Sequence, residues 1–302
     1  MLSKVQGSSR SVVLYLFALV CVLAPAQDLA HPVRTQLDTS RYRMMRGHIS
    51  DWTFWITQDS SDATNYLKRS YYKHQMRDYS GAIADLTEAI RLDSGFADAY
   101  MNRGYAKFEL KDYEGTLADY KKGIALSPLD PINYLNRAYA RSAIGDDRAA
   151  IKDLDKSVEL DPQHAKAYCN RGMCKRKIGD DTGALYDYNK AIELDPAYAE
   201  AYNNRGFVKA DKRDTDGAMA DFNKAILFAP AFVQAYDNRG GLKLELGDLE
   251  GAIADFSKAL ELDPDFAEAY ESRAKVYLKL GDTAKANADM ARAAALHKAD
   301  GK

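Results

Sequence analysis

Several signatures of enzymes and of cross-linked proteins are scarce or missing in this chain of 302 residues. It has 3 Cys, too few for a disulfide framework, and no Cys/His spacing matches a zinc site. Its 42 Lys+Arg and 44 Asp+Glu leave no basic excess for nucleic acid. Phosphate-binding glycine loops and the G-x-S-x-G and H-E-x-x-H motifs are absent. We therefore expect no enzymatic activity, cofactor, metal, nucleic-acid partner or small-molecule substrate.

Long apolar runs are equally scarce, and the one at residues 11–24 follows the basic residues Lys4 and Arg10. Ala24 and Ala26 then flank Pro25, which is the small-residue pattern of a cleavage site before Gln27. The run is shorter than the roughly 20 apolar residues of a membrane-spanning helix. Residues 1–26 are predicted to be a cleavable signal peptide for a periplasmic protein. The alternative is an uncleaved N-terminal segment that anchors the chain to a membrane.

The rest of the chain is dominated by a regular internal period. Tyrosines recur at one fixed spacing along the whole region: Tyr66, Tyr100, Tyr134, Tyr168, Tyr202, Tyr236 and Tyr270. Placing each Tyr at position 4 defines seven ungapped repeats: 63–96, 97–130, 131–164, 165–198, 199–232, 233–266 and 267–300. A fixed period of this length indicates stacked supersecondary units.

Each repeat is predicted to form two helices joined by a short turn. The first covers positions 1 to about 14, and position 16 is Asp in every repeat, where it can cap the second helix. Proline at position 32 of five repeats then stops the second helix. Such a hairpin cannot bury its apolar face alone, so the hairpins are expected to stack.

This pattern resembles the tetratricopeptide repeat family over residues 63–300. The family has an aromatic residue at position 4, small residues at positions 8, 20 and 27, and a bulky residue at position 24; here Gly104, Ala82, Ala89 and Leu86 are examples. The resemblance implies an all-α fold, a right-handed α-solenoid of seven tandem 34-residue helix-turn-helix repeats. It also implies a concave groove lined mainly by the first helices, and a protein or peptide as partner.

Two charged positions depart from the commonest form of the family. Position 7 is always Arg and position 23 is always Asp, as in Arg171 and Asp187. We predict a ladder of internal Arg–Asp pairs, within a repeat or between neighbours. The alternative is an anion-binding stripe of arginines.

In the family, positions 5, 6 and 9 belong to the groove. The predicted peptide-binding residues here are an Asn row at position 6, aromatic residues at position 9 and apolar residues at position 5: Asn102, Asn136, Asn170, Asn204 and Asn238; Tyr71, Tyr105, Tyr139 and Phe207; Met101 and Leu135. Asn can bond to the backbone of any extended peptide. Equally, these Asn side chains could bond to their own helix or to water, and the aromatic rings could pack on the N-terminal segment.

Other residues of the repeats receive structural interpretations. Cys169 and Cys174 are five residues apart on one helix, too far along the axis for a disulfide. The five His show no ligand spacing and are read as ordinary side chains. Towards the C-terminus, position 5 becomes polar and acidic, as in Asn203, Asp237 and Glu271.

Residues 27–62 precede the repeats, with four Arg followed by the only two Trp of the chain. They are predicted to cap the first repeat, or else to dock a partner or a second copy. Weak self-association through the array ends is a further alternative.

The combined features favour a non-enzymatic adaptor or scaffold of the cell envelope, which binds a peptide segment or a protein surface in its groove. The alternative is a chaperone-like holder of exported or secreted client proteins. A catalytic module has only residues 27–62 outside the repeats, too few for an independent core.

Overall fold

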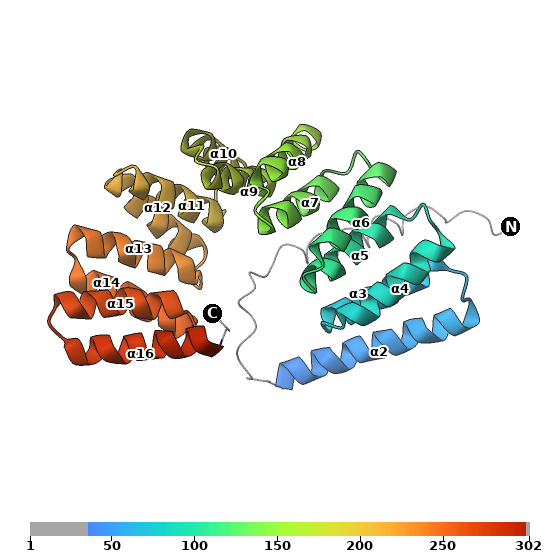
Figure 1. The fold of residues 1–302 in the computed structure, drawn as a ribbon, viewed down its shortest axis with the longest axis horizontal. Helices are drawn as coiled ribbons and strands as arrows, with labels where there is room; N and C mark the ends of the chain where they lie inside the picture. Colours follow the sequence, from blue (N-terminus) through green and yellow to red (C-terminus); the bar gives the residue numbers. More distant parts are fainter. Residues whose placement is uncertain (1–35, 300–302) are drawn as a thin grey trace. The chain divides into compact units, whose positions relative to one another are not determined.

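The computed structural model describes residues 36–299, which form fifteen α-helices and no strand. The predicted signal peptide and the first residues of the N-terminal extension lie outside the described residues. The first described helix is α2 (Gln36–Gln58) (Figure 1). Fourteen further helices form seven hairpins: α3 (Ala63–Gln75) and α4 (Tyr79–Leu92), α5 (Ala97–Glu109) and α6 (Tyr113–Leu126), α7 (Pro131–Ala143) and α8 (Asp147–Leu160), α9 (Ala165–Lys177) and α10 (Asp181–Leu194), α11 (Ala199–Asp211) and α12 (Thr215–Phe228), α13 (Val233–Leu246) and α14 (Leu249–Leu262), α15 (Ala267–Lys279) and α16 (Thr283–Ala299).

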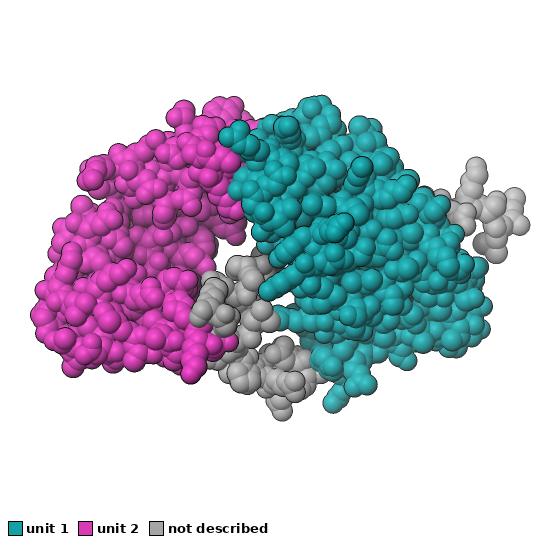
Figure 2. Space-filling view, in the orientation of Figure 1, with its two compact units in different colours: residues 1–162 teal, residues 163–302 magenta. Residues whose placement is uncertain are grey.

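The chain divides into two compact units, residues 1–162 and residues 163–302 (Figure 2). In the N-terminal unit α2 contacts α3, and each second helix contacts the first helix of the next hairpin. In the C-terminal unit the first helices α9, α11, α13 and α15 also contact one another in sequence. Within each unit successive hairpins therefore stack in tandem, and the fold is an all-α repeat solenoid as predicted.

The helix boundaries follow from capping at fixed positions. The side chain of Asp at position 16 accepts a hydrogen bond from the backbone N–H three residues on in all seven repeats, for example from Gly81 to Asp78 at 2.9 Å. This satisfies one of the N–H groups that a helix start leaves without a partner. The predicted caps are thus confirmed.

Small residues at position 8 allow the two helices of a hairpin to approach closely. A Cβ on Gly104 would lie 2.8 Å from the ring of Tyr120 at position 24, and Gly206 meets Phe222 in the same way. Tyr120 and Phe222 are buried, as are the alanines at position 20. In these hairpins a bulky residue at position 24 therefore packs directly against the small residue at position 8.

Helix α2 lies against the first hairpin. Met45 and Ile56 are buried, the ring of His48 stacks on Tyr72 at 4.5 Å, and the Lys68 ammonium sits 4.4 Å from the Trp52 ring centre. Residues of α2 thus pack on the first repeat, where the N-terminal extension was predicted to form a cap.

Candidate interaction surface

The arginines at position 7 hold each hairpin together through paired hydrogen bonds. Nε and Nη2 of each Arg donate to the two oxygens of the Asp at position 23 of the same repeat; for Arg171 and Asp187 the distances are 2.9 and 2.7 Å. The other six repeats have the same geometry. The predicted ladder is confirmed, and it is formed within repeats. Because these guanidinium groups are already paired, they do not form an anion-binding stripe.

A second cation, which was not among the residues predicted from the sequence, completes this network. In the first six repeats the Asp also pairs with Lys or Arg at position 11, as Asp187 does with Lys175 at 2.8 Å. The last repeat has Tyr277 at that position. The recurrence of a cation at position 11 in six of the seven repeats was a visible signal, and its partner was the Asp already identified.

The same arginines also connect neighbouring hairpins. Nη1 of Arg103, Arg205, Arg239 and Arg273 donates to a polar side chain at position 25 of the preceding repeat: Thr87, Asn189, Asn223 and Ser257. Each position-7 guanidinium also lies 5.3 to 5.9 Å from the ring centre of the position-4 tyrosine of its own helix. The periodic tyrosines therefore support the ladder.

The Asn row at position 6 separates into two groups. In the C-terminal unit the Asn204 amide donates to Cys169 Sγ at 3.8 Å, and the Asn238 amide donates to Asn203 Oδ1 at 2.9 Å. Both acceptors lie at position 5 of the preceding repeat. Among the described residues, Asn102, Asn136 and Asn170 have no hydrogen-bond partner for their side chains. The equivalent position-5 residues in the N-terminal unit, Leu67 and Met101, are apolar and offer no strong acceptor.

The aromatic residues at position 9 stack on the side chain at position 12 of the preceding repeat. The ring centres of Tyr105 and His74 lie 4.7 Å apart in a stacked arrangement. Those of Tyr139 and Phe108 lie 5.3 Å apart in a tilted arrangement. In the C-terminal unit the Arg176 guanidinium lies 4.3 Å from the Phe207 ring centre. Tyr71 is half-buried and contacts Tyr72 edge-on at 5.1 Å. Tyr139 alone of these four is mainly exposed, at 57%.

Burial removes two predicted residues from any contact surface. Met101 and Leu135 are only 7% and 6% exposed, and Met101 packs with Tyr120 and Ala140. Position 5 faces the next hairpin, and its side chain is covered by that packing. The periodicity placed these residues on the correct helix but did not show which part of the helix surface the next hairpin covers.

Position 5 becomes polar in the C-terminal unit, where Asp237 is the unusual case. One carboxylate oxygen of Asp237 is buried without a hydrogen-bond donor, because position 6 of the next repeat is Ser272 in place of Asn. Burial, with Glu268 nearby, raises the pKa of Asp237 to about 6. Glu271 is exposed and contacts His297 at 2.9 Å.

His74 is not the ordinary side chain that its sequence context suggested. It is buried, with Tyr79 edge-on at 5.0 Å and Tyr105 stacked on it, and its Nε2 has no partner. Burial lowers the pKa of the imidazole to about 4. The ring is therefore neutral near pH 7 and serves as an aromatic contact between the first two hairpins.

Three further features of the described part of the chain are its thiols, its potential metal ligands and the apolar character of its helices. Cys169 and Cys174 are buried and are not joined in a disulfide, and burial raises the pKa of the Cys169 thiol to about 12. Within residues 36–299 no three His, Cys, Asp or Glu side chains gather as a metal site requires. None of the described helices combines the length and the apolar character that crossing a membrane would require.

Comparison with known proteins agrees with this architecture. Models described as TPR repeat match residues 175–212 and 242–281, and models described as tetratricopeptide repeat match residues 67–131, 133–164 and 199–232. No curated protein sequence matches the chain.

Solved structures show the same fold. A tetratricopeptide repeat protein from Parabacteroides merdae ATCC 43184 is 20% identical, with a TM-score of 0.66 over 78% of this chain and 93% of that one. YrrB, described as a TPR protein with an unusual peptide-binding site, is 24% identical, with a TM-score of 0.50 over 61% of this chain and 95% of that one. The Cut9–Hcn1 complex contains a chain that is 15% identical, with a TM-score of 0.66 over 79% of this chain and 46% of that one.

The family models together match more than half of the chain, and the paired helices, caps and small-residue contacts are those of the repeat. The chain therefore belongs to the tetratricopeptide repeat family, whose repeats form scaffolds for protein–protein interaction.

Proposed function

We propose that the chain is a non-enzymatic adaptor that binds an extended peptide segment of a partner protein on the first helices of its N-terminal unit. The surface consists of Asn102 and Tyr105 on α5 with Asn136 and Tyr139 on α7. The observation that carries the proposal is the unused hydrogen-bonding capacity of Asn102 and Asn136. Each amide offers two donors and one acceptor to a peptide backbone.

The aromatic rings beside these amides indicate the kind of side chain that the peptide carries. Tyr139 is 57% exposed, and one side of its ring packs against Phe108. The remaining surface of the Tyr139 ring is therefore accessible to a ligand. Tyrosine supplies a large contact area with few rotatable bonds, and for this reason it is frequent at binding hot spots. We expect a peptide that places an apolar or aromatic side chain against Tyr139.

The part of the C-terminal unit beyond Asn170 provides an internal contrast. Asn204 and Asn238 already donate to neighbouring side chains, and Phe207 is covered by Arg176. Binding there would require these contacts to be exchanged for contacts with the ligand. This difference favours the N-terminal unit as the binding surface.

Selection of peptides from a displayed random library against the purified protein tests the proposal. The double variant N102A/N136A should bind the recovered peptides with an affinity at least tenfold lower, while the thermal midpoint of the protein stays unchanged. The matched control N204A/N238A should lower the thermal midpoint and leave peptide affinity unchanged, because its amides bond within the protein. Equal affinity of wild type and N102A/N136A would contradict the proposal. Recovery of many unrelated, weakly bound sequences would favour the chaperone-like holder instead.

We also propose that the protein acts in the cell envelope, exported to the periplasm by residues 1–26. The support is the basic start, the apolar run of residues 11–24 and the Ala-Pro-Ala site. N-terminal sequencing of protein recovered from the periplasm should begin at Gln27. Recovery only in membranes, beginning at Met1, would indicate the uncleaved anchor.

A further inference from the structure

Helix α2 continues the repeat period one half-repeat upstream of the seven repeats. Ile49, Asp51, Thr53 and Ile56 each lie one full repeat length before the same residue type in α4: Ile83, Asp85, Thr87 and Ile90. Thr53 Oγ1 accepts a hydrogen bond from Arg69 Nη1 at 3.2 Å, as Thr87 Oγ1 does from Arg103 Nη1. Residues 45–58 therefore occupy the place of the second helix of an additional hairpin.

Within residues 36–299 this additional hairpin has no separate first helix, because α2 is one continuous helix from Gln36 to Gln58. In α4 the equivalent positions face α3: the side chain of Asp85 is 4% exposed and Ala89 is fully buried. In α2 the side chain of Asp51 is 70% exposed and Trp55 is 53% exposed. A surface that a partner helix covers in the other hairpins is therefore open on α2.

The open surface is mainly apolar and includes one acid, Asp51. Met44, Gly47, Asp51, Phe54 and Trp55 follow one another at helical spacing, so they share one face of α2. Met44 and Phe54 are each 56% exposed, and the ring centres of Phe54 and Trp55 lie 5.7 Å apart in an edge-to-face arrangement. A Cβ on Gly47 would have no atom within 4 Å. We name this set the α2 face.

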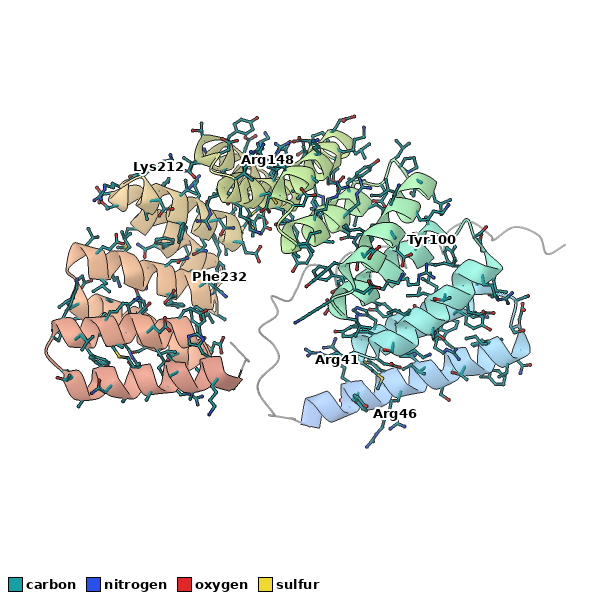
Figure 3. The ribbon with its side chains drawn as sticks, viewed as in Figure 1. Arg41, Arg46, Tyr100, Arg148, Lys212 and Phe232 are labelled. Carbon is teal, nitrogen blue, oxygen red and sulfur yellow. The ribbon has the colours of Figure 1, made fainter. Side chains whose placement is uncertain are left out.

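The charges on this helix are complementary under a two-fold rotation. Its first half has the exposed Arg43 and Arg46, and Figure 3 shows Arg46 projecting from α2 away from α3. Asp51 lies in the second half, where it contacts His48 of the same helix at 3.8 Å. Two antiparallel copies of α2 would set the arginines of each helix beside Asp51 of the other.

We propose that the α2 face docks against the α2 face of a second copy of this chain, with the two helices antiparallel. The arrangement is that of the hairpins themselves, in which Arg on one helix pairs with Asp on an antiparallel helix. Two-fold symmetry forms both sets of charge pairs at once. Gly47 lies near the middle of the face, where it lets the backbones approach, and Trp55 and Met44 are covered by the partner helix.

The expected dimer is reversible. One helix pair buries less than the roughly 800 Å² per partner of a standard stable interface. Sedimentation equilibrium of the purified protein over a concentration series should fit a monomer–dimer equilibrium, and association should weaken as salt screens the charge pairs.

Charge reversal tests the pairing. The variant D51R should raise the dimer dissociation constant at least tenfold, and R43D/R46D should do the same. The combined triple variant restores opposite charges across the interface and should return the constant to within about threefold of wild type. E114R changes an exposed acid on α6 in the same way, and it serves as the charge-matched control that leaves association unchanged.

A second pair of variants tests the apolar part of the surface. W55A should weaken association, whereas L129A, which truncates a side chain that is 77% exposed elsewhere in the N-terminal unit, should not. Circular dichroism establishes that each variant is folded. A wild-type protein that stays monomeric, a folded triple variant that stays dissociated, or assemblies that grow beyond a dimer would each overturn the proposal.

Discussion

The Asp side chain at position 23 is buried in every repeat, with side chains no more than 10% exposed, and it is held by a bidentate Arg. Asp187 is fully buried and has Arg171 and Lys175 as partners. A buried charge is tolerated only when it is paired, so loss of one partner costs more than loss of the pair.

We predict that R171L destabilises the protein by about 3 to 5 kcal/mol, because it leaves the Asp187 carboxylate short of a partner in the interior. The double variant R171L/D187L should recover much of this loss. The free energies of unfolding from denaturant titration measure both effects. Single-variant losses that simply add in the double variant would show that the two side chains are not coupled.

His74 makes stability depend on pH. Its folded pKa of about 4 lies below the ordinary value of 6.5, so the unfolded chain binds the proton more readily. Stability from this group is complete above pH 6.5 and is lost as the pH falls towards 4. The loss amounts to roughly 3 kcal/mol when both states are protonated. H74F should flatten this part of the pH profile of unfolding, and an unchanged profile would contradict the assignment.

At the scale of the element, the turn between the helices of each hairpin has one fixed conformation. Position 15 has a positive φ in all seven repeats, between 61° and 85°. Glycine occupies it four times, at Gly145, Gly179, Gly247 and Gly281, whereas Arg77, Lys111 and Arg213 adopt it in the other three. The left-handed conformation costs a residue with a Cβ roughly 1 kcal/mol or more.

We predict that K111G stabilises the protein by up to about 1 kcal/mol, because glycine removes the strain at this turn. The reverse change G145K, in the neighbouring hairpin, should destabilise it by a similar amount. Thermal unfolding of the two variants against wild type provides the measurement. A loss of stability in K111G would mean that the lysine side chain contributes more than the strain costs.

The elements could be predicted because their determinants are local. Helix starts, turns and stops are set by single residues such as Asp78 and Gly145 at fixed positions, and the period aligns them. Whether a surface side chain forms a hydrogen bond within the protein depends instead on the residue that it meets in the adjacent hairpin. Asn204 and Asn102 are equivalent in the sequence, but only Asn204 meets an acceptor, because Cys169 replaces the apolar residue found earlier in the array.

At the scale of the whole molecule, contacts are made between neighbours in a linear series, and stability should be distributed in the same way. A variant that lacks residues 36–58 exposes α3 and removes the bond from Arg69 to Thr53. Hydrogen exchange of amides in α3 and α4 should accelerate at least tenfold, whereas amides in α13 and α14 should be unaffected. Uniform acceleration along the chain would show that the array unfolds as one cooperative body.

The position-7 arginine also makes the array tolerant of rearrangement by whole repeats. Arg137 lacks the link to the preceding hairpin, because position 25 there is Lys121. Excision of residues 97–130 would put Arg137 where Arg103 now stands, opposite Thr87, and would give it the hydrogen bond that it lacks. A deletion that is not a whole number of repeats would break the register. Gene duplication and recombination in steps of one whole repeat would thus keep the arginine at position 7 opposite position 25 of its new neighbour.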